Sequence, residues 1–217
     1  MARKWSALDP DLVVMEATYG IVMALTLVTA AQLGIVHYDE RRTLIIAILA
    51  MDFVWGAIDM FAFFRSDVTA ERRRVNLLKN IQFADRRADY RDEVVSELDA
   101  TIVDLMDDRT KDEIIDLVLQ GKINHKPLAG RYRQYFVNAM GAFAVTFTTA
   151  IPPALCVLFI SDQTDAFFWA SFTSSVLMFF IGYYFAPFKA LWAKAVWGLT
   201  LVGTALSLTF FAAIFGG

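Results

Sequence analysis

The chain of 217 residues has little of what builds a catalytic or a disulfide-linked protein. It contains one cysteine, Cys156, and two histidines, His37 and His125. A single cysteine excludes a disulfide framework and a thiolate metal site within one chain. The histidines fall in connections on opposite sides of the predicted membrane, so we expect no joint metal site between them. No Ser-His-Asp set, phosphate-binding glycine loop or paired-cysteine zinc spacing occurs. The sequence therefore indicates a protein that is not an enzyme and has no tightly bound cofactor.

Charge is also missing over long stretches. Hydrophobic residues make up 57% of the chain and the mean hydropathy is +0.47. A helix needs about 20 apolar residues to cross the hydrocarbon of a bilayer, and five stretches reach that length. We predict an all-α membrane protein with five transmembrane helices in the lipid bilayer and no nucleic-acid partner. The predicted spans are 12–34, 42–64, 134–160, 164–187 and 190–215.

The predicted organisation has three parts: 1–64 with the first two spans, a helical insert at 65–133, and 134–217 with the last three spans. Apolar residues between 94 and 106 recur at helical spacing. A second amphipathic helix is predicted from Lys111 to Gln120, ending at Gly121. Thr110 is its predicted N-cap, and Glu113 would complete a capping box.

The distribution of Lys and Arg predicts the orientation. Of the 20 basic residues, 14 lie between Arg65 and Arg133, whereas the connection between the third and fourth spans has none. Basic residues are enriched in cytoplasmic connections. We therefore predict a multi-pass integral membrane protein with its N-terminus and insert in the cytoplasm and its C-terminus outside or in a lumen.

Three acids interrupt the first two apolar stretches. Asp52 and Asp59 are seven positions apart, so on a helix they share one face about 10 Å apart. Glu16 lies in the first span, which runs in the opposite direction, and we expect it at the depth of Asp59. A carboxyl group near the bilayer centre costs about 2.5–3.5 kcal/mol and normally faces the bundle interior, a partner or water. The predicted ion pathway comprises Glu16, Tyr19, Met23, Asp52, Asp59 and Asn138.

A structural role for these acids is the alternative. A protonated carboxyl group that is hydrogen-bonded to a neighbouring helix would only stabilise packing. Glu16 is also close to the first turn of its helix, where an acid is favourable.

Acidic residues of the insert form a second candidate site, for a metal. They recur at spacings of three and four, and two facing helices could bring their oxygens together around a divalent cation. The same residues alternate with Arg86, Arg87 and Arg91, which is typical of a solvated helix face with ion pairs. Both interpretations are open. The candidate metal ligands are Asp85, Asp89, Asp92, Glu93, Glu97, Asp112, Glu113 and Asp116.

The order of these parts, two spans, a carboxylate-rich helical insert and three further spans, resembles the vacuolar iron transporter (Ccc1-like) family. Local similarity lies in "EATYGIVMALTLVTAA" in the first span, "AMDFVWGAIDM" in the second, "AMGAFAVTFTTAIPPAL" in the third and "GLTLVGTALSLTFFAAIFGG" at the end. At the positions of the family's Asp-Gly pair this chain has Tyr19 and Gly20. We interpret the chain as a divergent bacterial-type member.

The resemblance implies a homodimer that exports a divalent metal ion, iron(II) or manganese(II), from the cytoplasm, with proton antiport as the coupling. Insert carboxylates would collect the ion, Glu16 and Asp59 would form the entry site, and Asp52 the mid-membrane site. The alternative from another class is a non-transporting membrane scaffold or regulator whose cytoplasmic helices bind a protein partner. Apolar residues left exposed on the insert would favour that alternative.

Overall fold

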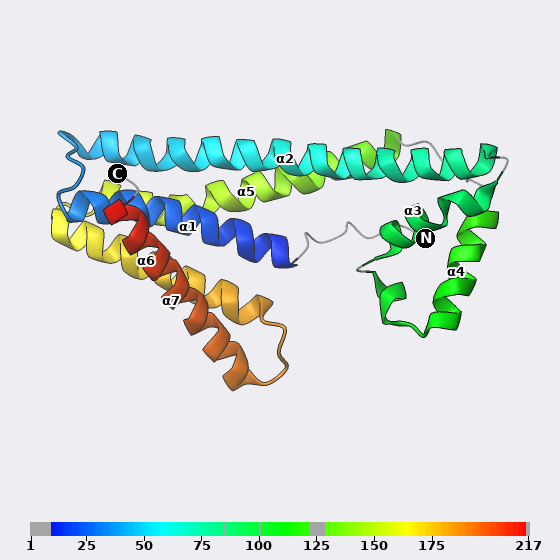
Figure 1. The fold of residues 1–217 in the computed structure, drawn as a ribbon. Helices are drawn as coiled ribbons and strands as arrows, with labels where there is room; N and C mark the ends of the chain where they lie inside the picture. The colour runs from blue at the N-terminus through cyan, green and yellow to red at the C-terminus, as the bar shows by residue number, and fades with distance from the viewer. Residues whose placement is uncertain (1–9, 85, 100, 122–128, 216–217) are drawn as a thin grey trace. The chain divides into compact units, whose positions relative to one another are not determined.

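The structure is a computed structural model that describes residues 10–84, 86–99, 101–121 and 129–215. Within these residues the chain forms α-helices and two short 3₁₀ helices, with no strand (Figure 1). In chain order they are α1 (Pro10–Gln32), α2 (Arg41–Phe83), η1 (Arg87–Tyr90), α3 (Arg91–Leu98), η2 (Ile102–Leu105), α4 (Asp108–Gln120), α5 (Ala129–Phe159), α6 (Gln163–Phe185) and α7 (Leu191–Phe215).

The predicted all-α fold with five long apolar helices is confirmed. Helices α1, α2, α5, α6 and α7 each contain a stretch that is long and apolar enough to cross a membrane. A bilayer offers backbone groups no hydrogen-bond partner, so a segment that crosses it forms its hydrogen bonds within the helix. These five helices are compatible with a multi-pass integral membrane protein.

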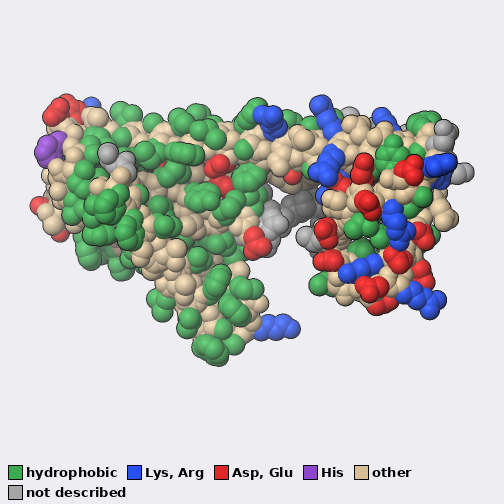
Figure 2. Space-filling model, viewed as in Figure 1, with side chains coloured by type: hydrophobic (Ala, Val, Ile, Leu, Met, Phe, Trp, Pro, Cys, Tyr) green, Lys and Arg blue, Asp and Glu red, His purple; other side chains and the backbone are tan. Residues whose placement is uncertain are grey.

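The contacts divide the chain into two units. The bundle unit comprises Met1–Ala62 and Phe136–Gly217, and the insert unit comprises Phe63–Tyr135. Figure 2 shows apolar side chains over the bundle helices and most of the charged side chains on the insert helices. This difference in surface is expected when one unit is surrounded by lipid and the other by water.

Two apolar clusters hold the bundle unit together. In the first, Ala24 and Val28 of α1 pack with Ile48 of α2, Ala150 and Ala154 of α5, and Ala170 of α6. In the second, Ile21 and Leu25 of α1 pack with Met178 of α6 and Ala205 of α7. Helix α1 therefore lies at the centre of the bundle, in contact with both α6 and α7 (Figure 1).

Glycines allow α6 and α7 to cross closely. A Cβ placed on Gly182 would lie 2.8 Å from Cα of Gly198, and a Cβ on Gly198 would lie 2.7 Å from the carbonyl oxygen of Phe179. Small residues at such crossings let helix backbones approach in a membrane.

Helix α2 is longer than the predicted span 42–64. It continues for 43 residues, or about 65 Å at 1.5 Å per residue, which is twice the hydrocarbon thickness of a bilayer. No glycine or proline occurs between Ala57 and Phe83 to end the helix. The second half of α2 forms the first helix of the insert unit.

The insert unit has a small core of its own. Ile81 of α2, Val94 of α3, and Ile115 and Leu119 of α4 are buried together. At the other end of the unit Glu71 is buried and accepts hydrogen bonds from the guanidinium of Arg131 and from the hydroxyl of Tyr135.

Two predictions about the insert are wrong. The apolar residues from 94 to 106 do not form one helix, because α3 ends at Leu98 and Ile102–Leu105 forms a 3₁₀ helix that exposes its apolar side chains. The N-cap of α4 is Asp107 and not Thr110. The carboxylate of Asp107 accepts hydrogen bonds from the backbone N–H and hydroxyl of Thr110, at 3.1 and 2.7 Å. The predicted end of this helix, at Gln120 with Gly121 following, is confirmed.

Candidate functional site

Glu16 of α1 is fully buried in the bundle unit. Its Oε2 accepts a hydrogen bond of 2.6 Å from the hydroxyl of Thr146 on α5, whereas Oε1 is buried without a donor. A buried polar atom without a partner is costly. The Glu16 carboxyl is therefore half satisfied by the protein and has one oxygen left for a proton or a cation.

Asp52 of α2 is also fully buried, and neither of its carboxylate oxygens has a hydrogen-bond partner. An isolated ionised carboxylate in an apolar interior is strongly disfavoured. A bound proton or a bound cation has to balance this group, because no Lys or Arg occurs in residues 11–32, 43–64 or 134–160, the apolar stretches of the helices that meet at Asp52. Asp52 is the least compensated acid among the described residues.

Gly20 lies close to both acids. It lies one turn after Glu16 on α1, and a Cβ at this position would lie 2.3 Å from Oγ1 of Thr149, 2.5 Å from the carbonyl oxygen of Thr146 and 3.2 Å from Oδ1 of Asp52. Three oxygens from α2 and α5 thus converge on the bare backbone of α1. Only glycine fits at this position, because any side chain would push the three helices apart.

Asp59 completes the cluster on α2. Its half-buried carboxyl lies close enough to that of Glu16 for the two groups to interact electrostatically. Two ionised carboxylates repel each other, and a bound proton or cation would relieve that repulsion. We call Glu16, Asp52, Asp59, Thr146 and Thr149, with the backbone at Gly20, the oxygen site.

The other residues of the predicted ion pathway lie less directly at this site. Tyr19 is 49% exposed, so about half of its surface faces away from the bundle interior. Met23 and Asn138 are half buried. Thr146 and Thr149 were missed by sequence reasoning. Their signal was two hydroxyl residues three positions apart in an apolar span, which places them on the same helix face.

The acids of the insert unit are largely engaged by arginines. Arg91 of α3 donates to Asp112 at 2.6 Å and to Asp116 at 2.8 Å, both on α4. Hydrogen bonding to Asp116 and the charge of both acids raise the pKa of the Arg91 guanidinium. Glu97 pairs with Arg73 at 2.8 Å and with Arg74 at 3.3 Å. These pairs are the arrangement expected of a solvated, ion-paired helix face.

The remaining predicted metal ligands lie apart from these pairs or in ion pairs of their own. Glu113 pairs with Arg109 at 3.2 Å, and Asp89, Asp92 and Glu93 are exposed. Asp85 lies outside the described residues. Among the residues that the structure describes, no group of three or more His, Cys, Asp or Glu side chains is arranged to hold a metal ion.

Comparison with models of known protein families, with curated protein sequences and with solved structures finds no match for this chain. Membership of the vacuolar iron transporter family therefore stays a prediction.

Proposed function

We propose that this chain transports a divalent cation, iron(II) or manganese(II), out of the cytoplasm in exchange for protons, with the oxygen site as its binding site. The observation that carries the proposal is Asp52, a fully buried acid of an apolar helix with both carboxylate oxygens unpartnered. Ionisable groups inside membrane helices are functional candidates by default, since they are costly to keep.

The chemistry of the site supports a hard or borderline cation. The three atoms nearest to a Cβ at Gly20 are oxygens: a carboxylate oxygen of Asp52, the hydroxyl of Thr149 and the carbonyl of Thr146. Carboxylate, carbonyl and hydroxyl oxygens suit Mg²⁺, Ca²⁺ and Mn²⁺, whereas soft thiolate ligands select Cu(I) and Zn²⁺. Manganese(II) and iron(II) fit such a set of ligands when water completes the coordination.

Proton exchange follows from the same groups. Cation binding needs ionised carboxylates, and in the absence of a cation the buried acids need protons. Glu16, one turn from Gly20, and Asp52, next to Gly20, therefore give neighbouring positions that hold either protons or a cation. A divalent ion that displaces two protons leaves the charge of the site unchanged. This exchange at one site is sufficient to couple the cation flux to the proton flux.

Titration calorimetry of the full-length protein in detergent tests this proposal. Mn²⁺ and anaerobic Fe²⁺ are expected to bind saturably, and titrations in two buffers of different ionisation enthalpy are expected to report released protons. Asp52→Asn is expected to weaken binding by about tenfold or more, equivalent to at least about 1.4 kcal/mol, and to reduce the number of released protons. Asp165→Asn is the matched control, because Asp165 is an exposed acid in the first turn of α6. Equal binding by the two variants would overturn the proposal.

One observation favours the alternative function, a scaffold or regulator. The insert unit exposes large apolar side chains, with Ile102 73% exposed and Leu105 87% exposed. Positions i and i+3 of a 3₁₀ helix lie above each other, so the two form one apolar ridge on η2. Such a ridge suits a protein partner. Two variants separate the two functions. If the protein is a transporter, Leu105→Ser keeps its cation flux and Asp52→Asn loses it. If it is a scaffold, Leu105→Ser loses its cellular role and Asp52→Asn keeps it.

A further inference from the structure

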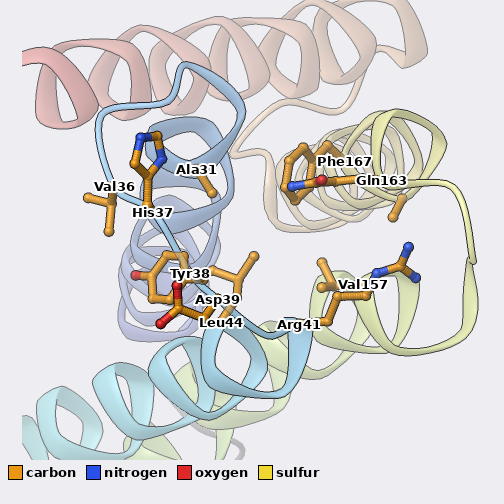
Figure 3. Close-up of a pocket in the computed structure, with 11 residues that line it drawn as sticks. Ala31, Val36, His37, Tyr38, Asp39, Arg41, Leu44, Val157, Gln163 and Phe167 are labelled. Atoms are coloured by element: carbon orange, nitrogen blue, oxygen red, sulfur yellow. The ribbon is translucent and has the colours of Figure 1, made fainter.

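The bundle unit contains a pocket at the end where α1 and α2 are joined. Its volume is about 390 Å³, and it opens between the α1–α2 connection and the start of α6. Figure 3 shows His37, Tyr38 and Asp39 on one side of this pocket and Gln163 and Phe167 on the other. Since one water occupies about 30 Å³ of liquid, the pocket has room for on the order of ten waters.

The face of α2 that carries Asp52 leads to this pocket. Ile48 lies one turn before Asp52 and is fully buried, and Leu44 lies a further turn before it and lines the pocket. The distance from Asp52 to Leu44 along the axis is eight residues, or about 12 Å. The oxygen site and the pocket are thus separated by two helical turns on one face of α2.

On α1, too, the oxygen site, the apolar cluster and the pocket follow one another along the helix. Gly20 lies at the oxygen site, Ala24 and Val28 are fully buried in the apolar cluster, and Ala31 lines the pocket. Helix α5 repeats this order in the same chain direction as α1. Thr149 lies at the oxygen site, Ala154 in the cluster and Val157 at both the cluster and the pocket. Three helices therefore lead from the buried acids to the pocket.

An apolar layer separates the two polar places. We define the seal as Ala24, Val28, Ile48, Ala150 and Ala154, none of which has a polar side-chain atom and all of which are fully buried or nearly so. A cation cannot cross such a layer without water, and apolar constrictions close channels by excluding water. Three of the five residues are alanines, so a small separation of α1, α2 and α5 is enough to admit water.

The pocket itself is suited to a hydrated cation. His37, Asp39 and Gln163 contribute polar groups to its lining. Arg41 is the basic residue of the lining, and its guanidinium donates to the backbone carbonyls of Ile160 and Ser161. The Arg41 side chain points towards the α5–α6 connection in Figure 3. Its charge is held against that connection.

We propose that the pocket at the α1–α2 connection is the mouth through which the cation leaves the oxygen site, and that the seal is the closed gate between them. This inference rests on the proposed function. On the predicted orientation the mouth lies on the side opposite the cytoplasm. The route runs within one protomer, between α1, α2 and α5, and it is shut in the structure described here.

Cysteine accessibility tests the route independently of transport. In a Cys156→Ser background, single cysteines replace Ala31 at the pocket, Ala24 in the seal and Ala50, which is exposed on another face of α2. The probe is a charged, membrane-impermeant methanethiosulfonate added to the full-length protein in sealed liposomes. Ala31→Cys is expected to react, because it faces water. Ala24→Cys and Ala50→Cys are expected not to react, because one is sealed and the other faces lipid.

A second pair of substitutions tests the gate. Ile48→Ser, added to Ala24→Cys, is expected to make that cysteine reactive by admitting water. Ile46→Ser is the matched control, because Ile46 is 65% exposed and two positions away; it is expected to leave Ala24→Cys unreactive. Ile48→Ala, with a milder opening, serves if the serine variant fails to fold.

The outcomes separate this inference from the proposed function. An unreactive Ala31→Cys, or an Ala24→Cys that reacts without Ile48→Ser, would overturn the route. The labelling pattern described above together with no Mn²⁺ flux in the parent protein would overturn the proposed function and leave the hydrated mouth and its seal supported.

Discussion

The hydroxyl of Thr146 lies 2.6 Å from Oε2 of Glu16, although the two residues are 130 positions apart in the chain. Both side chains are fully buried. This hydrogen bond joins α5 to α1 at the place where Gly20 brings Asp52 and Thr149 together. It is the contact that assembles the oxygen site from separate helices.

Thr146→Val is expected to destabilise the protein by about 1–3 kcal/mol, because it keeps the volume but leaves Oε2 of Glu16 buried without a donor. The thermal unfolding midpoint in detergent measures the effect. Thr200→Val is the matched control. The Thr200 hydroxyl is exposed and donates to the carbonyl of Val196 on its own helix. A loss of stability in the control as large as in Thr146→Val would contradict the assigned role.

Gly20→Ala is expected to disrupt the oxygen site. The new Cβ would lie 2.5 Å from the backbone oxygen of Thr146, so α1 and α5 have to separate. Overpacking of this kind costs about 1–3 kcal/mol, and Mn²⁺ binding should weaken with it. Gly203→Ala has no atom within 4 Å of its Cβ and is expected to be neutral or slightly stabilising. Unchanged Mn²⁺ affinity in Gly20→Ala would show that this close approach is not needed.

The N-cap of α4 predicts a pH dependence in the insert unit. Hydrogen bonds from the hydroxyl and backbone N–H of Thr110 hold the pKa of Asp107 below its ordinary value. A carboxyl group with a lowered pKa in the folded state stabilises it above the unfolded pKa, near 4, and loses that contribution as the pH falls through the folded pKa. Circular dichroism at 222 nm is expected to show an acid-induced loss of helix that is smaller in Asp107→Asn, since asparagine caps without titrating. Identical acid titrations of the two proteins would exclude this cap as the cause.

The ion pairs between arginines and acids of the insert predict how strongly these acids bind a metal ion. Arg91→Gln frees Asp112 and Asp116 and is expected to raise the affinity of the insert for Mn²⁺, because two neighbouring carboxylates lose their counter-ion. Arg109→Gln frees the single Glu113 and should have a smaller effect. Calorimetry in the Asp52→Asn background isolates the contribution of the insert. No gain in Arg91→Gln would indicate that these acids are no metal ligands.

The sequence was sufficient to predict the five long helices and the acids of the site. Apolar stretches of the right length predict membrane helices directly, and Glu16, Asp52 and Asp59 were visible because no basic residue accompanies them. The contribution of Thr146 and Thr149 to the oxygen site could not be predicted from the sequence. It depends on which face of α5 meets α1, and a single sequence carries no signal for a pairing across 130 positions.

The wrong predictions in the insert have local causes. Asp107 and Thr110 are both good N-cap residues, and the choice of Asp107 makes Thr110 the donor. The run from 94 to 106 has helical spacing, yet Ile102 and Leu105 are exposed. Spacing alone does not distinguish an apolar face that is buried from one that remains exposed.

The proposed exchange of a cation for protons at Asp52 can be measured directly. Proteoliposomes with an internal metal-sensitive dye and an external pH indicator measure both fluxes at once. We expect the parent protein and Asp165→Asn to take up Mn²⁺ while protons move in the opposite direction. We expect Asp52→Asn to lose the Mn²⁺ flux and the proton flux together. Mn²⁺ flux that persists in Asp52→Asn with its proton coupling intact would contradict the account.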